Sequence, residues 1–445
     1  MNNRHGRTVR SRYPLLLWCT LVLSLPCQAS PVIERWTTSN GIQVLFVAAP
    51  EIPMVKLRVV FAAGSAADES TPGISILTNA LLDEGTDRLS ADEFHARLED
   101  TGADMGAGVT RDMAWLGLQC LTAPELAAPA TALMRAALLK PRFATGDFSR
   151  VRKQMLAGLR QEQGSPRALA MRAMHQALYG HHPYAMPENG TEASVTALAP
   201  PMVAAFHQRY YVSENALVVM VGALTHQAAV QMAESLVGGL PHGVPAPALP
   251  AVPVLTEGVF RRVDFPGEQS HVIYAQLGIS RLDPDYFPLV VGNHVLGGNG
   301  AVSLLFDEIR EKRGLSYSVD SYFEPMAAAG PFVVSLQTDF HQETEARKVL
   351  ETILSRFLSD GPTEAALEAA KRNLMGGFPL RIESNGKLLE YLTVIGFYHL
   401  PPDYLDTYTR AVEKVTRTQV REAFQRRIQM SRMAKITVGR SLSSP

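Results

Sequence analysis

The sequence has little cysteine, almost no net charge and few long apolar runs. Of its 3 cysteines in 445 residues, Cys19 and Cys27 fall in an N-terminal segment that reads as an export signal. Once that segment is removed Cys120 stands alone, so no intramolecular disulfide can form even in an oxidising compartment. Cys120 lies in the strand-like run Trp115–Leu121, which predicts a buried, inert thiol. A formal net charge of −1 gives no electrostatic reason to expect nucleic acid or an acidic membrane as partner.

The N-terminal segment has the three parts of a secretory signal peptide. Its apolar run, Tyr13–Pro26, follows a group of arginines and is too short for a comfortable membrane span. Small residues at Cys27 and Ala29 predict cleavage after Ala29, which gives a signal peptide of residues 1–29 and a periplasmic location. Lipidation of Cys27 is the alternative, and Pro26 fits a lipoprotein box poorly. No second apolar segment of spanning length follows, so we expect no membrane span in the mature chain.

The remainder of the chain reads as an internal duplication. At 46% hydrophobic and 19% charged residues, 445 residues suffice for two or more packed domains. Residues 33–240 and 258–440 share one order of patterns. Each half opens on an alternating strand, at Met54–Phe61 and His271–Ile279, and then continues into an apolar helix. These helices are Gly73–Leu82 and Phe287–Leu296. Both halves close on a short apolar strand that ends in Val-Gly.

Two copies of one unit define the predicted fold class, which is α+β. Each homologous α/β unit should form a mainly antiparallel sheet with helices packed on one face, since period-2 strands alternate with period-3.6 helices. The predicted domains are residues 30–240 and 258–445, joined by a Pro/Ala-rich linker at 241–257. Ser90 and Glu93 form a capping-box pattern that predicts the start of a helix over Ala91–Glu99.

Several short motifs occur in a fixed order along about 380 residues. They are Gly64-Ser65, the helix Gly73–Thr86, His182-Pro183-Tyr184, Gly190, Tyr211 with Asn215, and Arg310 through Tyr317. Singly each is weak, but their order and spacing resemble the pitrilysin/insulinase superfamily of zinc peptidases, in its short-chain branch. The resemblance implies the LuxS/MPP-like metallopeptidase fold.

The helix Gly73–Thr86 (GISILTNALLDEGT) lacks the metal-binding side chains of that superfamily. The family pattern Gly-x-x-His-x-x-Glu-His places Ile76, Asn79 and Ala80 where His, Glu and His belong. Ile and Ala have no lone pairs, and an amide at Asn79 cannot take up a proton as the general base must. On the helix Phe148–Gln163 the third ligand, a Glu, is replaced by Ala157 or Gly158. We therefore expect no metal and no cofactor in this chain.

Arg310 and Tyr317 keep the spacing of a pair that, in active relatives, reaches across to the zinc site and contacts the peptide. A guanidinium and a phenol are hydrogen-bond donors suited to a carbonyl oxygen that gains charge in the transition state. The alternative interpretation is structural, with Arg310 solvated on a helix and Tyr317 packed at the start of a strand. In the context of the family the catalytic interpretation is favoured.

The resemblance implies a shared active site. Relatives that form closed chambers need four such units, and this chain has two, so a second chain would complete the chamber. The leading hypothesis is a non-catalytic subunit of a periplasmic heterodimeric zinc endopeptidase, in which a homologous partner carries zinc and an unfolded peptide is the substrate. Two alternatives stay open. One is a non-enzymatic peptide-binding or assembly protein of this fold, and the other is an active zinc metallopeptidase with relocated ligands.

Overall fold

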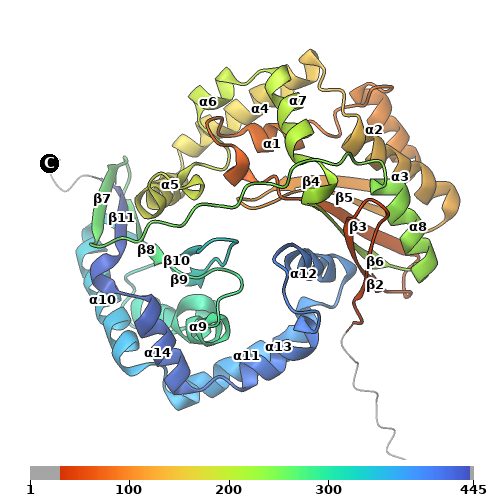
Figure 1. Cartoon of the computed structure of the whole chain (residues 1–445). Coiled ribbons are helices and arrows are strands. Elements are labelled where there is room, and N and C mark those ends of the chain that lie inside the picture. Colours follow the sequence, from red (N-terminus) through yellow and green to blue (C-terminus); the bar gives the residue numbers. More distant parts are fainter. Residues whose placement is uncertain (1–30, 441–445) are drawn as a thin grey trace, which may run out of the picture.

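The computed structural model describes residues 31–440, and these form two sheets with their helices (Figure 1). The predicted signal peptide, residues 1–29, lies outside the described residues. The first sheet is built from residues 34–222 and the second from residues 259–439. The α+β class with two homologous units is confirmed.

The first sheet has six strands in the order β1-β2-β6-β3-β5-β4. Its strands are β1 Glu34–Thr37, β2 Gln43–Ala48, β3 Met54–Phe61, β4 Asp104–Val109, β5 Ala114–Leu121 and β6 Ala216–Gly222. All neighbouring pairs are antiparallel except β2 with β6. The edge at β4 belongs to a strand of small residues (DMGAGV).

The second sheet repeats this topology without the extra first strand. Its order is β7-β11-β8-β10-β9, and only β7 with β11 is parallel. The strands are β7 Val259–Asp264, β8 Gln269–Leu277, β9 Ser318–Phe323, β10 Pro331–Asp339 and β11 Ala434–Gly439. Strand for strand it matches β2-β6-β3-β5-β4, so the duplication inferred from the sequence holds in the sheet order.

The helices follow in chain order between these strands. Those of the first half are α1 Ile74–Asn79, α2 Ala91–Asp100, α3 Pro124–Leu139, α4 Thr145–Gln163, α5 Pro166–Tyr179, α6 Glu192–Ala197, α7 Pro200–Tyr210 and α8 His226–Val237. Those of the second half are α9 Tyr286–Asn293, α10 Glu343–Asp360, α11 Glu364–Arg381, α12 Asn385–Phe397, α13 Tyr404–Glu413 and α14 Arg417–Arg427. The capping box at Ser90 and Glu93 is present and starts α2.

Alternation along the strands sets which face of the first sheet each side chain covers. On β5, Leu116, Leu118 and Cys120 point into the core under α3, α7 and α8. Cys120 is buried, as predicted, and burial raises the pKa of its thiol to about 11, which favours the unreactive protonated form. The intervening side chains, such as Trp115, face the opposite side of the sheet.

Each half lends one helix to the sheet of the other half. Helix α5, from the first half, packs on β8 and β11 of the second sheet through an apolar cluster that includes Met174, Leu178 and Ile436. Helix α12, from the second half, packs on β3 and β6 of the first sheet, and its Leu392 belongs to the same buried apolar cluster as Val219 of β6. Figure 1 shows α5 beside β7 and β11, and α12 beside β3 and β6. Both sheets are therefore covered on a second face by a helix that the sequence division assigns to the other unit.

A polar junction fixes the two units to one another around Asp112, in the turn between β4 and β5. Its carboxylate accepts hydrogen bonds from the Tyr184 hydroxyl, the Tyr398 hydroxyl at 2.8 Å and the backbone N–H of Ala327 at 2.8 Å. Tyr398 caps α12, and Ala327 belongs to the loop between β9 and β10. Donors from both halves of the chain thus meet on one carboxylate.

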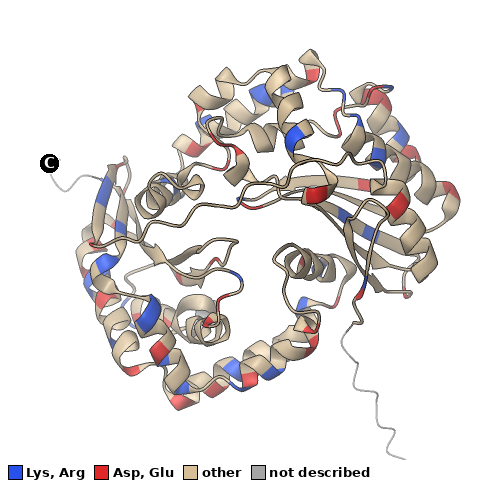
Figure 2. Ribbon diagram, in the orientation of Figure 1, with Lys and Arg blue, Asp and Glu red and all other residues tan. Residues whose placement is uncertain are grey.

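Charges of both signs are distributed over the described part of the chain. In Figure 2 lysine and arginine are interspersed with aspartate and glutamate along the outer helices, in keeping with a net charge of −1. Among residues 31–440, none of the helices combines the length and the apolar character that crossing a bilayer requires.

Candidate functional site

Helix α1, which the sequence resemblance aligns with a metal-binding helix, is anchored at its N-terminus. The Asp68 carboxylate accepts hydrogen bonds from the backbone N–H of Gly73 at 2.6 Å and of Ser75 at 3.0 Å. Burial nevertheless raises the pKa of Asp68 to about 7. Gly73 adopts φ +94°, a left-handed conformation that favours glycine. The helix ends at Asn79, shorter than the predicted Gly73–Thr86, because the following backbone bonds tighten into turns before Gly85.

Asn79 stands where the general base would be, and its amide is already engaged. It is 2% exposed, and its Nδ2 donates to the Trp115 carbonyl oxygen and to the Tyr211 hydroxyl, both at 3.2 Å. Both amide hydrogens are thereby paired. Asn79 fixes α1 to β5 and α7, and no donor of its amide is left for a ligand.

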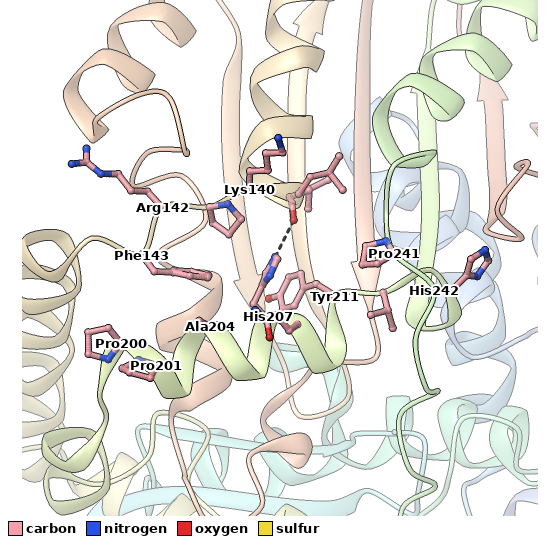
Figure 3. Close-up of a pocket in the computed structure, with 15 residues that line it drawn as sticks. Lys140, Arg142, Phe143, Pro200, Pro201, Ala204, His207, Tyr211, Pro241 and His242 are labelled. Atoms are coloured by element: carbon pink, nitrogen blue, oxygen red, sulfur yellow. Dashed lines mark hydrogen bonds between the residues drawn. The ribbon is translucent and has the colours of Figure 1, made fainter.

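Tyr211, the second anchor of Asn79, is itself held by an aromatic stack. Its ring lies 4.9 Å from the His207 ring at an interplanar angle of 22°, and 4.6 Å from the Phe61 ring. His207 donates from Nε2 to the Leu138 carbonyl at 2.9 Å, the bond dashed in Figure 3. His207 and Tyr211 line a cavity of about 680 Å³, whose other walls include Phe143 and four prolines. Burial lowers the pKa of the His207 ring to about 4, which favours the neutral ring at neutral pH.

The second half carries an asparagine at the matching place. When Gly73–Leu82 is laid beside Phe287–Leu296, Asn293 falls opposite Asn79. Asn293 donates to the Ser321 carbonyl at 2.9 Å and accepts from the Ser321 hydroxyl at 2.7 Å, which fixes α9 to β9. In both halves, then, an asparagine at this position anchors the helix to its sheet.

The remaining metal positions offer no ligands. Ile76 and Ala80 are half-buried, and Ala157 and Gly158 are exposed on α4, a helix that does pack against α1. Helices α1 and α4 thus pack together, while the side chains at these positions supply no imidazole or carboxylate. Zinc does not fit these residues. Across residues 31–440, no group of three or more His, Cys, Asp and Glu side chains is arranged to hold a metal ion.

Arg310 and Tyr317 come together in the second unit. The Arg310 guanidinium lies 5.4 Å from the centre of the Tyr317 ring and 4.6 Å from the centre of the Phe306 ring, so it makes a cation–π contact with each. Tyr317 is 78% exposed, and the Arg310 side chain is 41% exposed. The packed Tyr317 of the structural alternative is therefore not observed. Arg310 lies on a π-helical turn over Phe306–Glu311, a geometry frequent at functional sites.

A groove of about 440 Å³ adjoins this pair at the end of the second sheet. It is lined mostly by polar residues of β8, β10, the turn after β10 and the segment before β9, among them Gln269, Gln337 and Gln342. A separate cavity of about 90 Å³, lined in part by residues of α5, shares Gln337 with this groove. Sequence reasoning missed these glutamines, because they lie on three separate elements and share no motif.

The structure keeps the two sets of predicted site residues in different units. The hydrogen bonds of Asn79 stay within the first unit, and the ring contacts of Arg310 stay within the second. Within the described part of the chain, nothing joins them into one catalytic constellation.

Comparison with known proteins places the chain in a family. The family model described as Insulinase (Peptidase family M16) matches residues 43–192, and that described as Peptidase M16 inactive domain matches residues 198–374. A solved structure of a peptidase M16 inactive domain from Pseudomonas fluorescens is 35% identical, with a TM-score of 0.89, and the match covers 93% of this chain and 99% of that one.

Two curated relatives carry contrasting names. A protein of Helicobacter pylori called non-peptidase homolog YmxG is 25% identical over 92% of this chain and 94% of its own length. A protein of Bacillus subtilis called uncharacterized zinc protease YmxG is 24% identical over 80% of this chain and 86% of its own. Sheet order, helix placement and these matches agree: the chain belongs to the insulinase family of peptidases, family M16.

Proposed function

We propose that this chain is a non-catalytic subunit of a periplasmic heterodimeric zinc endopeptidase, and that it completes the active site of a homologous, zinc-bearing partner. The observation that carries the proposal is the contrast between its two units. In the first unit Asn79 anchors α1 by both amide hydrogens. In the second unit Arg310 and Tyr317 stay exposed and are held against one another.

The chemistry of the pair suits this role. A guanidinium and a phenol can donate hydrogen bonds to the oxygen of a peptide carbonyl as negative charge develops on it. The rings of Phe306 and Tyr317 hold the guanidinium in place before a peptide arrives. With two units in this chain and two in a homologue, the pair would face the partner's zinc site across a four-unit chamber.

Extended peptide has a surface to bind on each unit. Strand β4 ends the first sheet and strand β9 ends the second, so each of these described strands pairs with one neighbour only. A peptide can add to such an edge through main-chain hydrogen bonds. Strand β4 is rich in glycine and alanine, which leaves its backbone open to close approach.

A peptide-binding or assembly protein without an enzyme partner is the second candidate, because the same exposed pair and edge strands would serve it. An active zinc peptidase with relocated ligands is the third, and no observation on residues 31–440 favours it.

Reconstitution tests the proposal. The mature chain is purified alone and after co-expression with a homologue that carries His-x-x-Glu-His, and zinc content and cleavage of an unstructured fluorogenic peptide are measured. We expect zinc and turnover only in the mixture. Tyr317→Phe should lower turnover by about 10²-fold, the effect of losing one oxyanion donor, and leave association intact. Arg310→Ala is compared with Arg313→Ala, a nearby arginine that is paired with Glu308.

The alternatives give different results. Association without any turnover, or no association, would leave the peptide-binding or assembly role. Stoichiometric zinc and cleavage by the isolated chain would establish an active enzyme with other ligands. Equal turnover of the Tyr317→Phe mixture and the unmodified mixture would remove the oxyanion role.

A further inference from the structure

The cavity shown in Figure 3 lies in the first unit, on the face of the first sheet that α3, α7 and α8 cover. Its walls come from the end of α3, the segment before α4, helix α7, and Pro241 with His242 at the start of the linker. Its volume of about 680 Å³ falls within the range of small-molecule sites in proteins, about 300–1,000 Å³. The groove beside Arg310 is in the second unit, so the two sites are distinct.

The apolar walls of this cavity are rigid and flat. The Phe143 ring lies 5.6 Å from the His207 ring at an interplanar angle of 71°, and His207 is in turn stacked on Tyr211. Proline rings from α7 and from the segments after α3 and α8 line the cavity as well. Proline has no rotamer freedom to lose, and aromatic rings pack well on other rings, edge to face or offset. A flat aromatic ligand therefore fits these walls at a low entropic cost.

Positive charge borders the cavity, and its walls hold no matching carboxylate. Among the described residues that line it none is acidic, and Lys140 and Arg142 lie on the side opposite α7 (Figure 3). Lys140 pairs at 3.5 Å with Asp87, which lies outside the cavity. Arg142 forms no ion pair within residues 31–440, and its acidic neighbour Glu93 is engaged by Ser90 in the capping box. An anion in the cavity can therefore pair with Arg142.

We propose that this cavity binds a small aromatic carboxylate, with its ring against Phe143 and His207 and its carboxylate on the Arg142 guanidinium. The planar fork of an arginine matches the two oxygens of a carboxylate. Tyr211 forms another wall, and its hydroxyl accepts the hydrogen bond from Asn79 of α1. The ligand thus rests on the contact that anchors α1. It needs no partner subunit, so its binding is independent of the proposed function.

The test is isothermal titration calorimetry of the mature chain with naphthylacetate, whose fused rings carry one carboxylate. Naphthylacetamide, the neutral amide of the same shape, is compared with it. We expect saturable binding at one equivalent, with the acid at least about threefold tighter than the amide, the effect of one exposed charge-assisted contact. Arg142→Gln should abolish this preference. Arg97→Gln, at an exposed arginine that also acts on Glu93 but lies outside the cavity, should keep it.

Filling the cavity is a second, independent measurement. Ala204 is half-buried on α7 and lines the cavity, whereas its neighbour Ala205 is exposed and does not line it. Ala204→Phe should abolish the binding of naphthylacetate, and Ala205→Phe should leave it unchanged. Arg142→Gln changes an exposed side chain, so the comparison of acid with amide remains decisive if Ala204→Phe does not fold.

Three results would overturn the proposed site: no saturable binding, equal affinity for the acid and the amide, or full binding by a folded Ala204→Phe variant. An unchanged preference in Arg142→Gln would show that the carboxylate is not held by Arg142. A failure of the proposed function looks different, because a co-expressed pair without turnover would leave these affinities as they are.

Discussion

Acid should destabilise the protein through His175, a residue of the exchanged helix α5. His175 is 5% exposed, stacks on the Tyr179 ring at 5.6 Å, and has no hydrogen-bond partner at Nδ1. Burial, together with the nearby Arg111 charge, lowers its pKa from 6.5 to about 3. The folded state therefore keeps this ring neutral where the unfolded state binds a proton.

The sign and size follow from linkage. The pKa of His175 is lower in the folded state than in the unfolded state. Its titration therefore leaves the free energy of unfolding unchanged above pH 6.5 and lowers that free energy as the pH falls below 6.5. At pH 5 the unfolded histidine is protonated and the folded one is not, which costs about 2 kcal/mol at 1.36 kcal/mol per unit. Asp68 acts in the opposite direction, since its raised pKa makes the folded state bind a proton between about pH 7 and 4. Its contribution cancels when variants are compared at one pH.

Urea unfolding at pH 7 and pH 5 measures the effect. Between these pH values wild type should lose about 2 kcal/mol relative to His175→Gln, which removes the titrating ring and retains a side-chain donor. His181→Gln, at an exposed neighbouring histidine, should follow wild type. Parallel losses in wild type and His175→Gln would show that His175 is not the acid-sensitive group.

Two further predictions concern α1 and α12. Restoring the motif by Ile76→His, Asn79→Glu and Ala80→His should not give one equivalent of bound zinc by elemental analysis. Helix α4 would still lack the third ligand, and a carboxylate at position 79 would face the Trp115 carbonyl. Zinc at one equivalent would contradict this interpretation of the site. Leu392→Ala should lower the free energy of unfolding by about 2–5 kcal/mol, because Leu392 is fully buried between α12 and the first sheet. Urea unfolding should remain a single transition. Two separate transitions would show that the units fold independently.

Much of the fold follows from local patterns. Met54–Phe61 is a strand with the predicted bounds, and each half closes on the predicted apolar strand, at Ala216–Gly222 and Ala434–Gly439. Alternating or continuous β-branched residues leave little choice of structure there. The capping box at Ser90 likewise acts within a few residues. The exchange of α5 and α12 could not be predicted, because an apolar helix face does not specify which of two similar sheets will cover it.

The candidate site shows the same contrast between features set by local sequence and features set by residues remote along the chain. Loss of metal ligands at Ile76, Asn79 and Ala80 is visible in the sequence, because one helix carries all three. What Asn79 does instead depends on Trp115 and Tyr211, which are remote along the chain. The exposure of Tyr317 depends on a π-helical turn that no sequence pattern announces.

The exchange of α5 and α12 limits how this protein can be divided. Between α8 and β7, residues 238–258 contain no helix or strand. A single cut there should give two fragments that stay associated, because each holds a helix seated on the other's sheet. Expressed alone, each fragment would expose one apolar face of its sheet and the apolar face of its exchanged helix to solvent. Exposed apolar surfaces of this kind favour aggregation. The two duplicated halves therefore depend on one another. Recombination that replaces one half would have to supply a helix that packs on the sheet of the half that remains.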